Sequence, residues 1–425
     1  MEFRVNLGII GAGATGLTAA WDAVRAGHQV TVLEAAGELG GLAASLEVGG
    51  VPLERYYHHI FRSDKAMIAL IGELGLGDAL RFHRTTTGIY RGGELIDFST
   101  PFDMLRFPEF SPLDAVRFAG SSAVLKAVRD GGRRYNDVTA LAWLRRYAGR
   151  RATAAIWEPL LRGKFGDRAE EVSMAWLWAR VHCRTFELGY VDGGFERVYA
   201  ALRDGVQERG GKVEFGKAVR RIRQEGDTPV VSCADGSTYR FDRLIVTTPQ
   251  PAFAEAAGLP ADSAVRQNRY LGATCFVLEL DRSAIPYYWL NINEPDFPFL
   301  AVVEHTRMID PAVYGGRHVL YVGNYVERED PRFTTEPGEL LRTFLPYLRR
   351  INPEFEMSWI KDWHFSKAGF AQPVVTPRYR ELIPAHETPM SRVTLATMAQ
   401  IHPQDRGQSY AVEMARRVTA SLGLR

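Results

Sequence analysis

The sequence predicts an α/β fold in which one domain is interrupted twice by a second domain. Three observations predict it: a strand–helix–strand pattern at the start, a second α/β unit in the middle, and a short strand followed by a helix at the end. The chain has 425 residues, more than a single hydrophobic core usually supports. We therefore expect one domain from residues 1–60, 190–255 and 385–425, and a second from residues 61–189 and 256–384.

The first strand–helix–strand unit carries a glycine-rich turn. Residues 5–10 are apolar enough for a buried strand, and residues 17–24 have the side chains of a helix packed on it. The turn between them contains Gly11, Gly13 and Gly16. In the Rossmann fingerprint the first glycine permits a tight turn, the second leaves room for a pyrophosphate, and the third lets helix and strand approach. The pyrophosphate would meet free N–H groups at the helix N-terminus.

Glu34 directly follows the next predicted strand, residues 29–33, at the ~20-residue spacing of the fingerprint. A carboxylate there accepts hydrogen bonds from the adenosine ribose hydroxyls and repels a 2′-phosphate, which disfavours NADP. The alternative interpretation of these glycines is a glycine-rich loop that binds no nucleotide. Its position between strand and helix, together with the acid, predicts a site for an adenine dinucleotide.

The intervening residues are expected to form the second domain. Residues 60–188 are predicted to be mostly helical and aromatic, with a helix over residues 64–74 and another capped by Ser173. Residues 275–325 alternate apolar and polar side chains and predict strands, and residues 334–350 predict a helix.

A second α/β unit begins at the glycines of residues 193–194. The elements that follow are predicted as a helix over 198–206, a strand over 212–215, a hairpin of 230–233 with 237–241, a strand over 244–248, a final strand over 393–397 and a terminal helix over 409–422. The strands of this unit would extend the sheet begun by the first unit.

In their order and spacing, these motifs resemble the superfamily of flavin-containing amine oxidases, protoporphyrinogen oxidases and phytoene desaturases. The resemblance covers the whole chain unevenly and rests on residues 11–16, 33–43, 192–194, 219–222 and 242–249. It implies an α/β fold with a Rossmann-type FAD-binding domain of the GR2 type and an interleaved α+β substrate-binding domain. It also implies an enzyme, an FAD-dependent oxidase or dehydrogenase that is amine oxidase-like.

The resemblance further implies which residues would bind FAD. They are Gly11, Gly13, Thr15, Gly16, Glu34, Ala35, Gly40, Gly41, Leu42, Val219, Met398, Gly407, Gln408 and Ser409. The double-glycine loop would lie along the pyrophosphate and ribityl chain, and Val219 would hold the adenine through its backbone. The last helix would point its N-terminus at the isoalloxazine ring, where it stabilises the negative charge of a reduced flavin. The last cysteine is Cys275, so we expect no thioether link in the C-terminal third and noncovalent FAD.

The chain departs from the family pattern in two places. Family members commonly follow the last strand with Ala-Gly-Asp or Ala-Gly-Glu, whereas residues 396–398 here are Ala-Thr-Met. The carboxylate contact to a ribityl hydroxyl must be absent or come from another group, such as Asp405. Leu42 replaces an arginine that amine oxidases often carry, so FAD is implied more strongly than an amine substrate. Within the superfamily, residues 157–166 and 403–407 resemble members related to surface-sugar pathways.

Flavin chemistry requires a substrate C–H bond at the flavin N5 edge and the exclusion of water, but no recognisable triad. The best catalytic candidates are His58 and His59, which could supply a base or bind an anion. In the alternative interpretation, one caps a backbone carbonyl and the other faces solvent. Lys367 is a third candidate, because several amine oxidases hold a water near N5 with a lysine. A solvated surface lysine is the alternative there.

Two further segments have both a functional and an ordinary interpretation. Arg378 and Arg380 could bind a phosphate or carboxylate of the substrate, or lie on a solvated face. Residues 102–127 mix apolar side chains with basic ones and could form an interfacial stretch that makes peripheral membrane contact, or an ordinary surface helix.

The composition excludes several classes of function. Lys and Arg number 52 against 50 Asp and Glu, so no overall field attracts nucleic acid. Three scattered cysteines without a CxxC motif predict a reducing, cytoplasmic location, no disulfides and no metal site. The first strand starts close to Met1, and no apolar run approaches ~18 residues, so neither a secretory signal nor a membrane span is expected.

The predicted function is FAD-dependent removal of a hydride equivalent from a C–N or C–C unit of a small or lipophilic metabolite, with electrons passed to oxygen or another acceptor. Two alternatives remain open. One is a redox-neutral flavoenzyme, a nucleotide-sugar mutase or isomerase. The other is a non-catalytic flavoprotein that acts as a binding partner.

Overall fold

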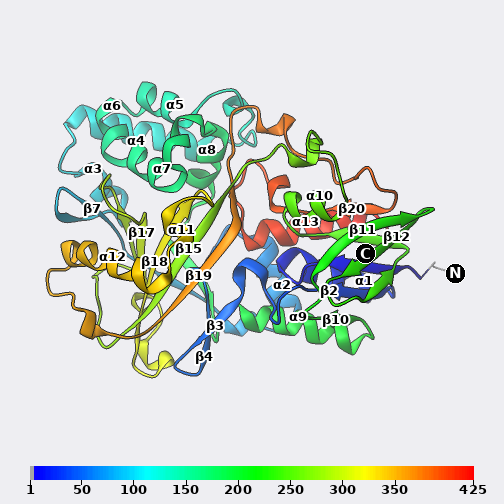
Figure 1. Ribbon diagram of the computed structural model, residues 1–425. Helices are drawn as coiled ribbons and strands as arrows, with labels where there is room; N and C mark the ends of the chain where they lie inside the picture. The colour runs from blue at the N-terminus through cyan, green and yellow to red at the C-terminus, as the bar shows by residue number, and fades with distance from the viewer. Residues whose placement is uncertain (1–3) are drawn as a thin grey trace.

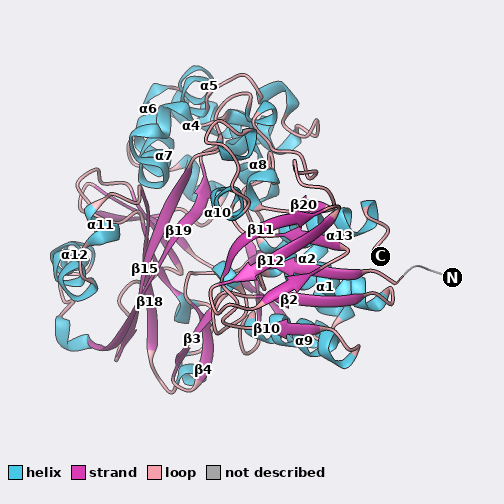
Figure 2. Ribbon diagram, turned by 45° about the vertical axis from the view of Figure 1, so that its right-hand side comes forward, coloured by secondary structure: helices cyan, strands magenta, loops and turns pink. Residues whose placement is uncertain are grey.

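The computed structural model describes residues 4–425 and divides into two regions that lie side by side (Figure 1). One is built on a five-stranded parallel sheet, and we call it the parallel-sheet region. The other is built on a seven-stranded sheet with a helical layer at one end, and we call it the mixed-sheet region (Figure 2). No helix in this part of the chain combines the length and the apolar character needed to cross a bilayer.

The parallel-sheet region draws its strands from well-separated parts of the chain. In spatial order they are β10 (Lys212–Glu214), β2 (Gln29–Leu33), β1 (Asn6–Ile10), β14 (Arg243–Val246) and β20 (Val393–Leu395), and every neighbouring pair is parallel. Parallel sheets need cover on both faces, which explains the apolar runs in β1, β2 and β14. This sheet confirms the predicted α/β class.

Helices cover this sheet and two smaller sheets flank it. The covering helices are α1 (Ala14–Arg25), α9 (Glu196–Glu208) and α13 (Gln408–Ser421). The smaller sheets are the hairpin of β3 (Ser45–Val48) with β4 (Val51–Glu54), and the antiparallel sheet of β11 (Val219–Glu225), β12 (Thr228–Cys233) and β13 (Thr238–Arg240). Helix α10 (Gln250–Ala256) follows β14. The predicted hairpin is therefore present, extended by β11.

The mixed-sheet region is organised around one long buried strand, β15 (Tyr270–Leu280). The spatial order of its sheet is β19 (Ile360–Pro373), β15, β18 (His318–Val326), β17 (Ala301–Glu304), β16 (Trp289–Ile292), β7 (Thr87–Arg91) and β8 (Glu94–Asp97). All pairs are antiparallel except β16 with β7. Helices α11 (Pro331–Thr334) and α12 (Pro337–Ile351) lie on this region, and α12 buries Leu341 and Phe344 in its core.

A helical layer covers one end of this sheet, as both ribbon views show. Its helices are α3 (Pro101–Leu105), α4 (Pro112–Ala127), α5 (Ala140–Tyr147), α6 (Arg150–Ala152), α7 (Glu158–Phe165) and α8 (Met174–Cys183), with a π-helical turn over Thr153–Trp157. Ser173 caps α8, because its hydroxyl accepts a hydrogen bond from the Ala175 N–H at 3.2 Å. That cap was predicted.

The prediction of a mostly helical segment over residues 60–188 was wrong in part. Besides α2 (Lys65–Glu73), its first forty residues form β5 (Ile60–Phe61), β6 (Leu80–Arg84), β7 and β8. Strands β5 and β6 pair with β9 (Glu187–Val191), and β7 pairs with β16. Because β9 lies far along the chain, no local pattern predicts β5 and β6. Strands β7 and β8, by contrast, pair with each other in a local hairpin across Gly92 and Gly93, a turn signal that the prediction did not use.

The stretch over residues 102–127 forms two helices. Thr100 caps α3 through Asp103, and Ser111 caps α4 through Asp114, each in a capping box followed by a proline. Because the second capping box starts a new helix at Ser111, α3 and α4 are separate helices.

Candidate functional site

The glycine turn at the start of α1 is shaped by three different requirements. Gly11 has φ +104°, and a Cβ at Gly16 would lie 1.9 Å from the Gly11 carbonyl oxygen. Both positions therefore need glycine for the protein's own packing. At Gly13, by contrast, a Cβ would meet nothing nearer than the Gly40 oxygen at 3.7 Å. The protein leaves the space above Gly13 open, as close approach of a ligand to the backbone requires.

The double-glycine loop lies directly against this turn. Gly13 and Gly40 form an isolated bridge, and the Gly40 N–H donates to the Ala12 carbonyl at 3.0 Å. Gly41 is exposed at φ +60°, and its Cβ position would lie 3.5 Å from the Gly13 Cα. Among residues 4–425 no side chain caps α1, so the N–H groups of its first turn, which includes partly exposed Thr15, are free to bind an anion.

Glu34 follows β2 and is oriented by two backbone donors. Its Oε2 accepts the Ala12 N–H at 2.7 Å and its Oε1 accepts the Ala36 N–H at 2.9 Å. A carboxylate has about four acceptor sites, so each oxygen can still accept a hydroxyl. Ala35, next along the chain, is exposed. Val219 begins β11, an edge strand whose outer backbone groups have no strand partner within the described residues 4–425.

The N-terminus of α13 offers a second set of free donors. Its first cap residue, Gly407, is exposed and supplies no side-chain hydrogen bond. Gln408 is buried: its Oε1 accepts the Tyr199 hydroxyl at 2.6 Å, while its Nε2 has no partner among residues 4–425. The Ser409 hydroxyl accepts the Met67 N–H at 3.3 Å. Met398 follows β20 in a 3-10 turn and is partly buried.

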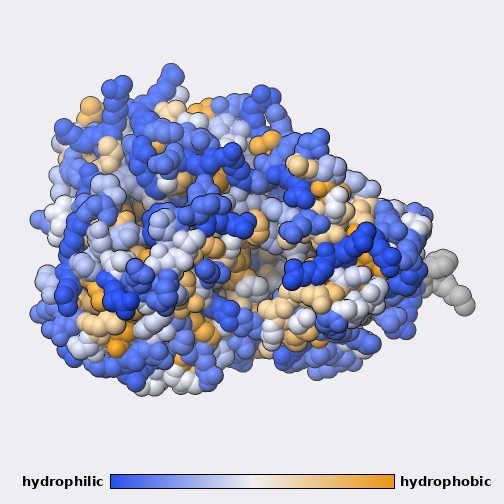
Figure 3. Space-filling model, in the orientation of Figure 1, coloured by the Kyte–Doolittle hydropathy of each residue, from blue (hydrophilic) through white to orange (hydrophobic). Residues whose placement is uncertain are grey.

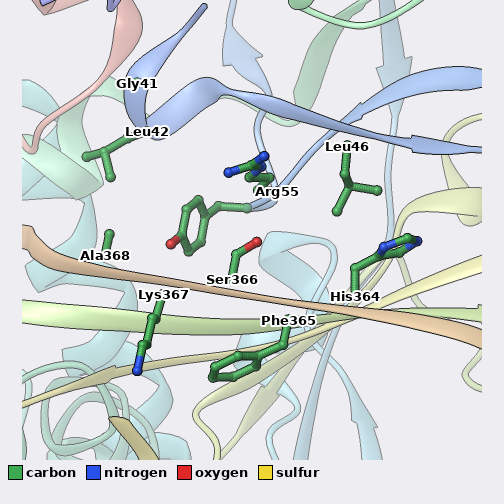
Figure 4. A pocket seen from close by; sticks show the side chains of 10 residues that line it. Gly41, Leu42, Leu46, Arg55, His364, Phe365, Ser366, Lys367 and Ala368 are labelled. Atoms are coloured by element: carbon green, nitrogen blue, oxygen red, sulfur yellow. The ribbon is translucent and has the colours of Figure 1, made fainter. Parts of the chain in front are cut away.

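A cavity of about 430 Å³ separates the double-glycine loop from β19 (Figure 4). It is lined by Gly41, Leu42, Leu46, Arg55, Tyr56, His364, Phe365, Ser366, Lys367 and Ala368. Ser366 points into the space, whereas Lys367 and Phe365 point to the other face of β19. The Lys367 ammonium donates to the Phe333 carbonyl at 3.2 Å and is exposed. The structure therefore does not bring its side chain to the histidines.

His58 and His59 lie between β4 and β5 and are largely enclosed. The His58 Nδ1 lies 2.7 Å from the Tyr56 carbonyl, so this nitrogen must carry the proton and Nε2 is left as the acceptor. The His59 Nδ1 lies 3.1 Å from the Tyr288 hydroxyl. Burial lowers the pKa of His58 to about 4 and that of His59 to about 3. Both rings are neutral at pH 7 and could act only as weak bases or hydrogen-bonding groups.

A charged group that the sequence analysis missed surrounds Asp405, in the loop before α13. The Lys164 ammonium from α7 lies 2.9 Å from its Oδ2, which also accepts from the Arg180 guanidinium of α8. Trp176 and Gln372 donate to Oδ1 at 3.0 and 3.2 Å. We call Asp405, Lys164, Arg180 and neighbouring Arg406 the Asp405 cluster.

The charges and the burial of this cluster shift the pKa values of Asp405 and Lys164. Burial opposes ionisation of Asp405, but Lys164, Arg180 and Arg406 hold its pKa well below the usual range. Burial lowers the pKa of Lys164 to about 7, although Asp405 raises it. At least two donors contact each carboxylate oxygen of Asp405, so its acceptor sites are filled and it is poorly placed to supply the ribityl contact considered above. Lys164 and Asp405 each lie in one of the two segments noted for their surface-sugar resemblance, which was the available signal.

The other candidate arginines lie elsewhere. Arg378 pairs with Glu381 at 2.8 Å and is exposed, and Arg380 donates to the Gly131 carbonyl at 3.1 Å. They fit the surface interpretation. Among residues 4–425, one group with metal-ligand geometry consists of Glu279, Asp362 and His364, in which the imidazole already pairs with Glu279 at 3.1 Å. The absence of a metal stays a prediction.

Comparisons with known proteins agree with the predicted resemblance. The family model described as flavin containing amine oxidoreductase matches residues 14–416. "Putative flavin-containing monoamine oxidase AofH" of Mycobacterium tuberculosis is 26% identical over 271 residues, which is 55% of each chain. A 15-cis-phytoene desaturase of Capsicum annuum is 26% identical over 278 residues, covering 58% of this chain and 46% of that protein. The chain thus spans about half the length of the curated relatives it matches.

Solved structures match over nearly the whole chain at low identity. A "putative protoporphyrinogen oxidase" from Exiguobacterium sp. 255-15 superposes with a TM-score of 0.78 at 20% identity, covering 100% of this chain and 99% of that one. Reduced UDP-galactopyranose mutase gives a TM-score of 0.77 at 14% identity, covering 100% and 95%. At such identities the likeness concerns the fold, and it confirms the predicted fold class.

Proposed function

The chain belongs to the flavin containing amine oxidoreductase family, and we propose that it is an enzyme that uses noncovalently bound FAD. In this proposal it removes a hydride equivalent from a C–N or C–C unit of a small or lipophilic metabolite. The observation that carries the proposal is the open approach between Gly13 and Gly41, beside the uncapped N-terminus of α1. The chain keeps glycine at Gly13 although its own packing does not demand it, and a dinucleotide supplies the reason.

Each part of FAD has a matching group in the chain. The first-turn N–H groups of α1 would bind the pyrophosphate, Glu34 the adenosine ribose, and the free edge of β11 at Val219 the adenine. The loop of Gly40, Gly41 and Leu42 would follow the ribityl chain. At α13 the unpartnered Nε2 of Gln408 and the free N–H groups fit the acceptor atoms of the flavin ring.

When bound, the flavin would supply the redox chemistry by accepting the hydride equivalent. The chain's own residues would position the substrate and keep water out. His58 keeps its proton on Nδ1 through Tyr56 and presents Nε2 as an acceptor. His59 is held by Tyr288 and packs edge-on against Phe61. These contacts support a rigid, mainly aromatic wall with two neutral imidazoles.

Acid precipitation of the purified protein tests the cofactor. The preparation should be yellow, and precipitation should release all of the flavin as FAD. The three cysteines are Cys183, Cys233 and Cys275, of which the last two are buried, so a thioether link is not expected. FMN in the supernatant, no flavin, or flavin left in the pellet would each contradict the proposal. An anaerobic screen of candidate substrates for flavin bleaching would then test oxidation.

A second candidate function is a redox-neutral rearrangement, as in a nucleotide-sugar mutase. Two observations favour it: the fold shared with a reduced UDP-galactopyranose mutase, and the ion pair between Lys164 and Asp405, which joins the two segments of surface-sugar resemblance. Product that forms only after the flavin has been reduced, with no net consumption of electrons, would favour this candidate over oxidation.

A further inference from the structure

We propose that the protein attaches peripherally to membranes, and that the exposed side of α3 and α4 binds the surface of a bilayer containing anionic lipids. The inference goes beyond the proposed function and does not depend on it, because it concerns a surface and not the flavin site. Both helices belong to the helical layer. On the surface of that end of the molecule, apolar residues lie among strongly hydrophilic ones (Figure 3).

Exposed apolar side chains are concentrated on this layer. Among residues 4–425, ten large hydrophobic side chains are exposed, and six of them fall between residues 102 and 147. Helices α3 and α5 both pack against α4, so the six belong to neighbouring elements. Single exposed apolar residues are normal, but a group of them marks an interaction site. The six are Phe102, Leu105, Leu113, Val116, Val124 and Tyr147.

Helix α4 is apolar on two opposite sides. On one side it buries Phe118 and Leu125 against the protein. On the other side, a row of exposed residues at helical spacing contains no charged or polar side chain, whereas a surface helix ordinarily presents polar groups to water there. The row consists of Leu113, Val116, Gly120, Ala123, Val124 and Ala127. We call this row, together with Phe102 and Leu105 of α3, the apolar stripe.

Exposed arginines border the apolar stripe at the ends of its two helices. Arg106 directly follows α3, and its guanidinium lies 4.5 Å from the centre of the Phe102 ring. Arg129 follows α4 by two residues. Within the described residues 4–425, neither arginine forms an ion pair, and both are exposed. Such long side chains can lie along apolar surface while the charged end reaches the lipid headgroups.

The wider helical layer is also positively charged. Residues 101–151 contain ten Lys and Arg against five Asp and Glu, although the whole chain has 52 against 50. Three of the five acids are engaged locally: Asp103 and Asp114 belong to the capping boxes, and Asp130 pairs with Arg134 at 2.7 Å. The basic charge of the chain therefore gathers around the apolar stripe.

This charge favours a membrane over a second copy of the chain as the occupant of the stripe. Two copies joined through the stripe would place two positively charged layers against each other, which like-charge repulsion opposes. An anionic bilayer surface attracts the arginines and takes up apolar side chains at the boundary between headgroups and acyl chains. Phe102 and Tyr147 are aromatic residues of the kind that interfacial segments place there.

Sedimentation with sucrose-loaded vesicles tests the inference on the full chain. One set of vesicles is phosphatidylcholine alone, and the other contains phosphatidylcholine and anionic phosphatidylglycerol in a ratio of about two to one. The partition coefficient onto the anionic vesicles should be higher by at least about tenfold at low salt. The difference should shrink as added salt screens the charges.

A double variant tests the apolar stripe. Leu113→Ser with Val116→Ser should weaken partition onto the anionic vesicles by about tenfold or more, because two side chains can no longer enter the bilayer. Both residues are exposed, at 66% and 67%, so the melting temperature should change little. Val313→Ser with Met357→Ser is the matched control, since it removes two exposed apolar side chains outside the helical layer and should bind vesicles as the natural chain does.

A second double variant tests the charge. Arg106→Gln with Arg129→Gln should reduce the preference for anionic vesicles by at least about fivefold and leave partition onto phosphatidylcholine unchanged. The corresponding lysine variants should keep the preference, because lipid attraction needs the charge and not the planar fork. Arg282→Gln with Arg342→Gln removes two exposed arginines outside the helical layer and should have no effect.

Three results would overturn the inference. The chain could stay in the supernatant with anionic vesicles, or the two apolar double variants could bind vesicles equally well. In the third, light scattering would show that Leu113→Ser with Val116→Ser dissociates an oligomer while vesicle binding persists, which would assign the stripe to a second copy of the chain. Protein without any flavin would contradict the proposed function and would leave each of these vesicle measurements valid.

Discussion

The glycine turn at α1 and the Asp405 cluster differ in the groups that they offer to a ligand. At the turn the protein presents backbone: Gly13 is open, the α1 N–H groups are uncapped, and Glu34 is the sole charged side chain assigned there. The cluster presents charged side chains from α7, α8 and the loop before α13. Backbone donors suit a ligand common to a whole family, whereas side chains can be exchanged when the substrate changes. From this comparison we infer that the turn binds the cofactor, and we propose that side chains near the cluster select the substrate.

The largest effect is expected from removing the charge at the centre of the cluster. Asp405→Asn leaves Lys164, Arg180 and Arg406 without their common anion. Breaking a largely buried ion pair from one side costs about 3–5 kcal/mol, so the free energy of unfolding should fall by an amount of that order. Chemical denaturation of the flavin-loaded protein measures it.

Asp296→Asn is the control, because Asp296 forms an exposed pair with Arg350 that is worth about 0–1 kcal/mol. If the two variants lose the same stability, the cluster is not a buried charge network and the contrast with the glycine turn disappears.

Glu34→Ala tests the other side of the comparison. Charge-assisted hydrogen bonds are worth about 1.5–3 kcal/mol each, so losing the ribose contacts should reduce FAD retention severely while the chain stays folded. The ratio of flavin to protein after extensive dialysis is the measurement. Glu208→Ala, on the exposed face of α9, should retain flavin as the natural chain does. Full occupancy in Glu34→Ala would remove Glu34 from the ribose site.

Two glycines only three residues apart should separate packing from ligand binding. Gly16→Ala forces a Cβ to within 1.9 Å of the Gly11 carbonyl oxygen, and overpacking of this kind costs about 1–3 kcal/mol of stability. Gly13→Ala meets no such contact and should keep its melting temperature without flavin, yet lose flavin affinity. If Gly13→Ala binds FAD normally, the open space above Gly13 has another purpose.

The same contrast explains what could be predicted from the sequence. The glycine turn and Glu34 lie within one short strand–helix–strand unit, so spacing alone describes their geometry. Lys164 and Asp405 are 241 residues apart, and Trp176 and Gln372 reach the same carboxylate from two further elements. No periodic pattern in the sequence predicts that these distant residues contact one another. Strands β5 and β6 were missed for the same reason, because their partner β9 is distant, whereas the local hairpin of β7 and β8 across Gly92 and Gly93 could have been predicted. The roles of Val219 and Met398 came from resemblance and stay predictions.

The smallest expected effect is on the pH dependence of stability, and it concerns His58. Burial and, to a smaller extent, nearby Arg406 lower the pKa of His58 to about 4, whereas an unfolded histidine has a pKa of ~6.5. Between those values the unfolded chain binds more protons than the folded one, so stability is present above about pH 6.5 and is lost as the pH falls. His58→Gln should remove part of this loss, since a glutamine amide can still donate to the Tyr56 carbonyl. The apparent melting temperature should therefore drop by about 2 °C less between pH 7 and pH 5 in the variant than in the natural chain.

His28→Gln serves as the control, because His28 lies in the loop before β2, away from the cluster. Equal acid sensitivity in His58→Gln and the natural chain would mean that His58 is solvated and charged like an ordinary histidine. His58 would then not be the neutral imidazole that we propose in the aromatic wall near Arg406.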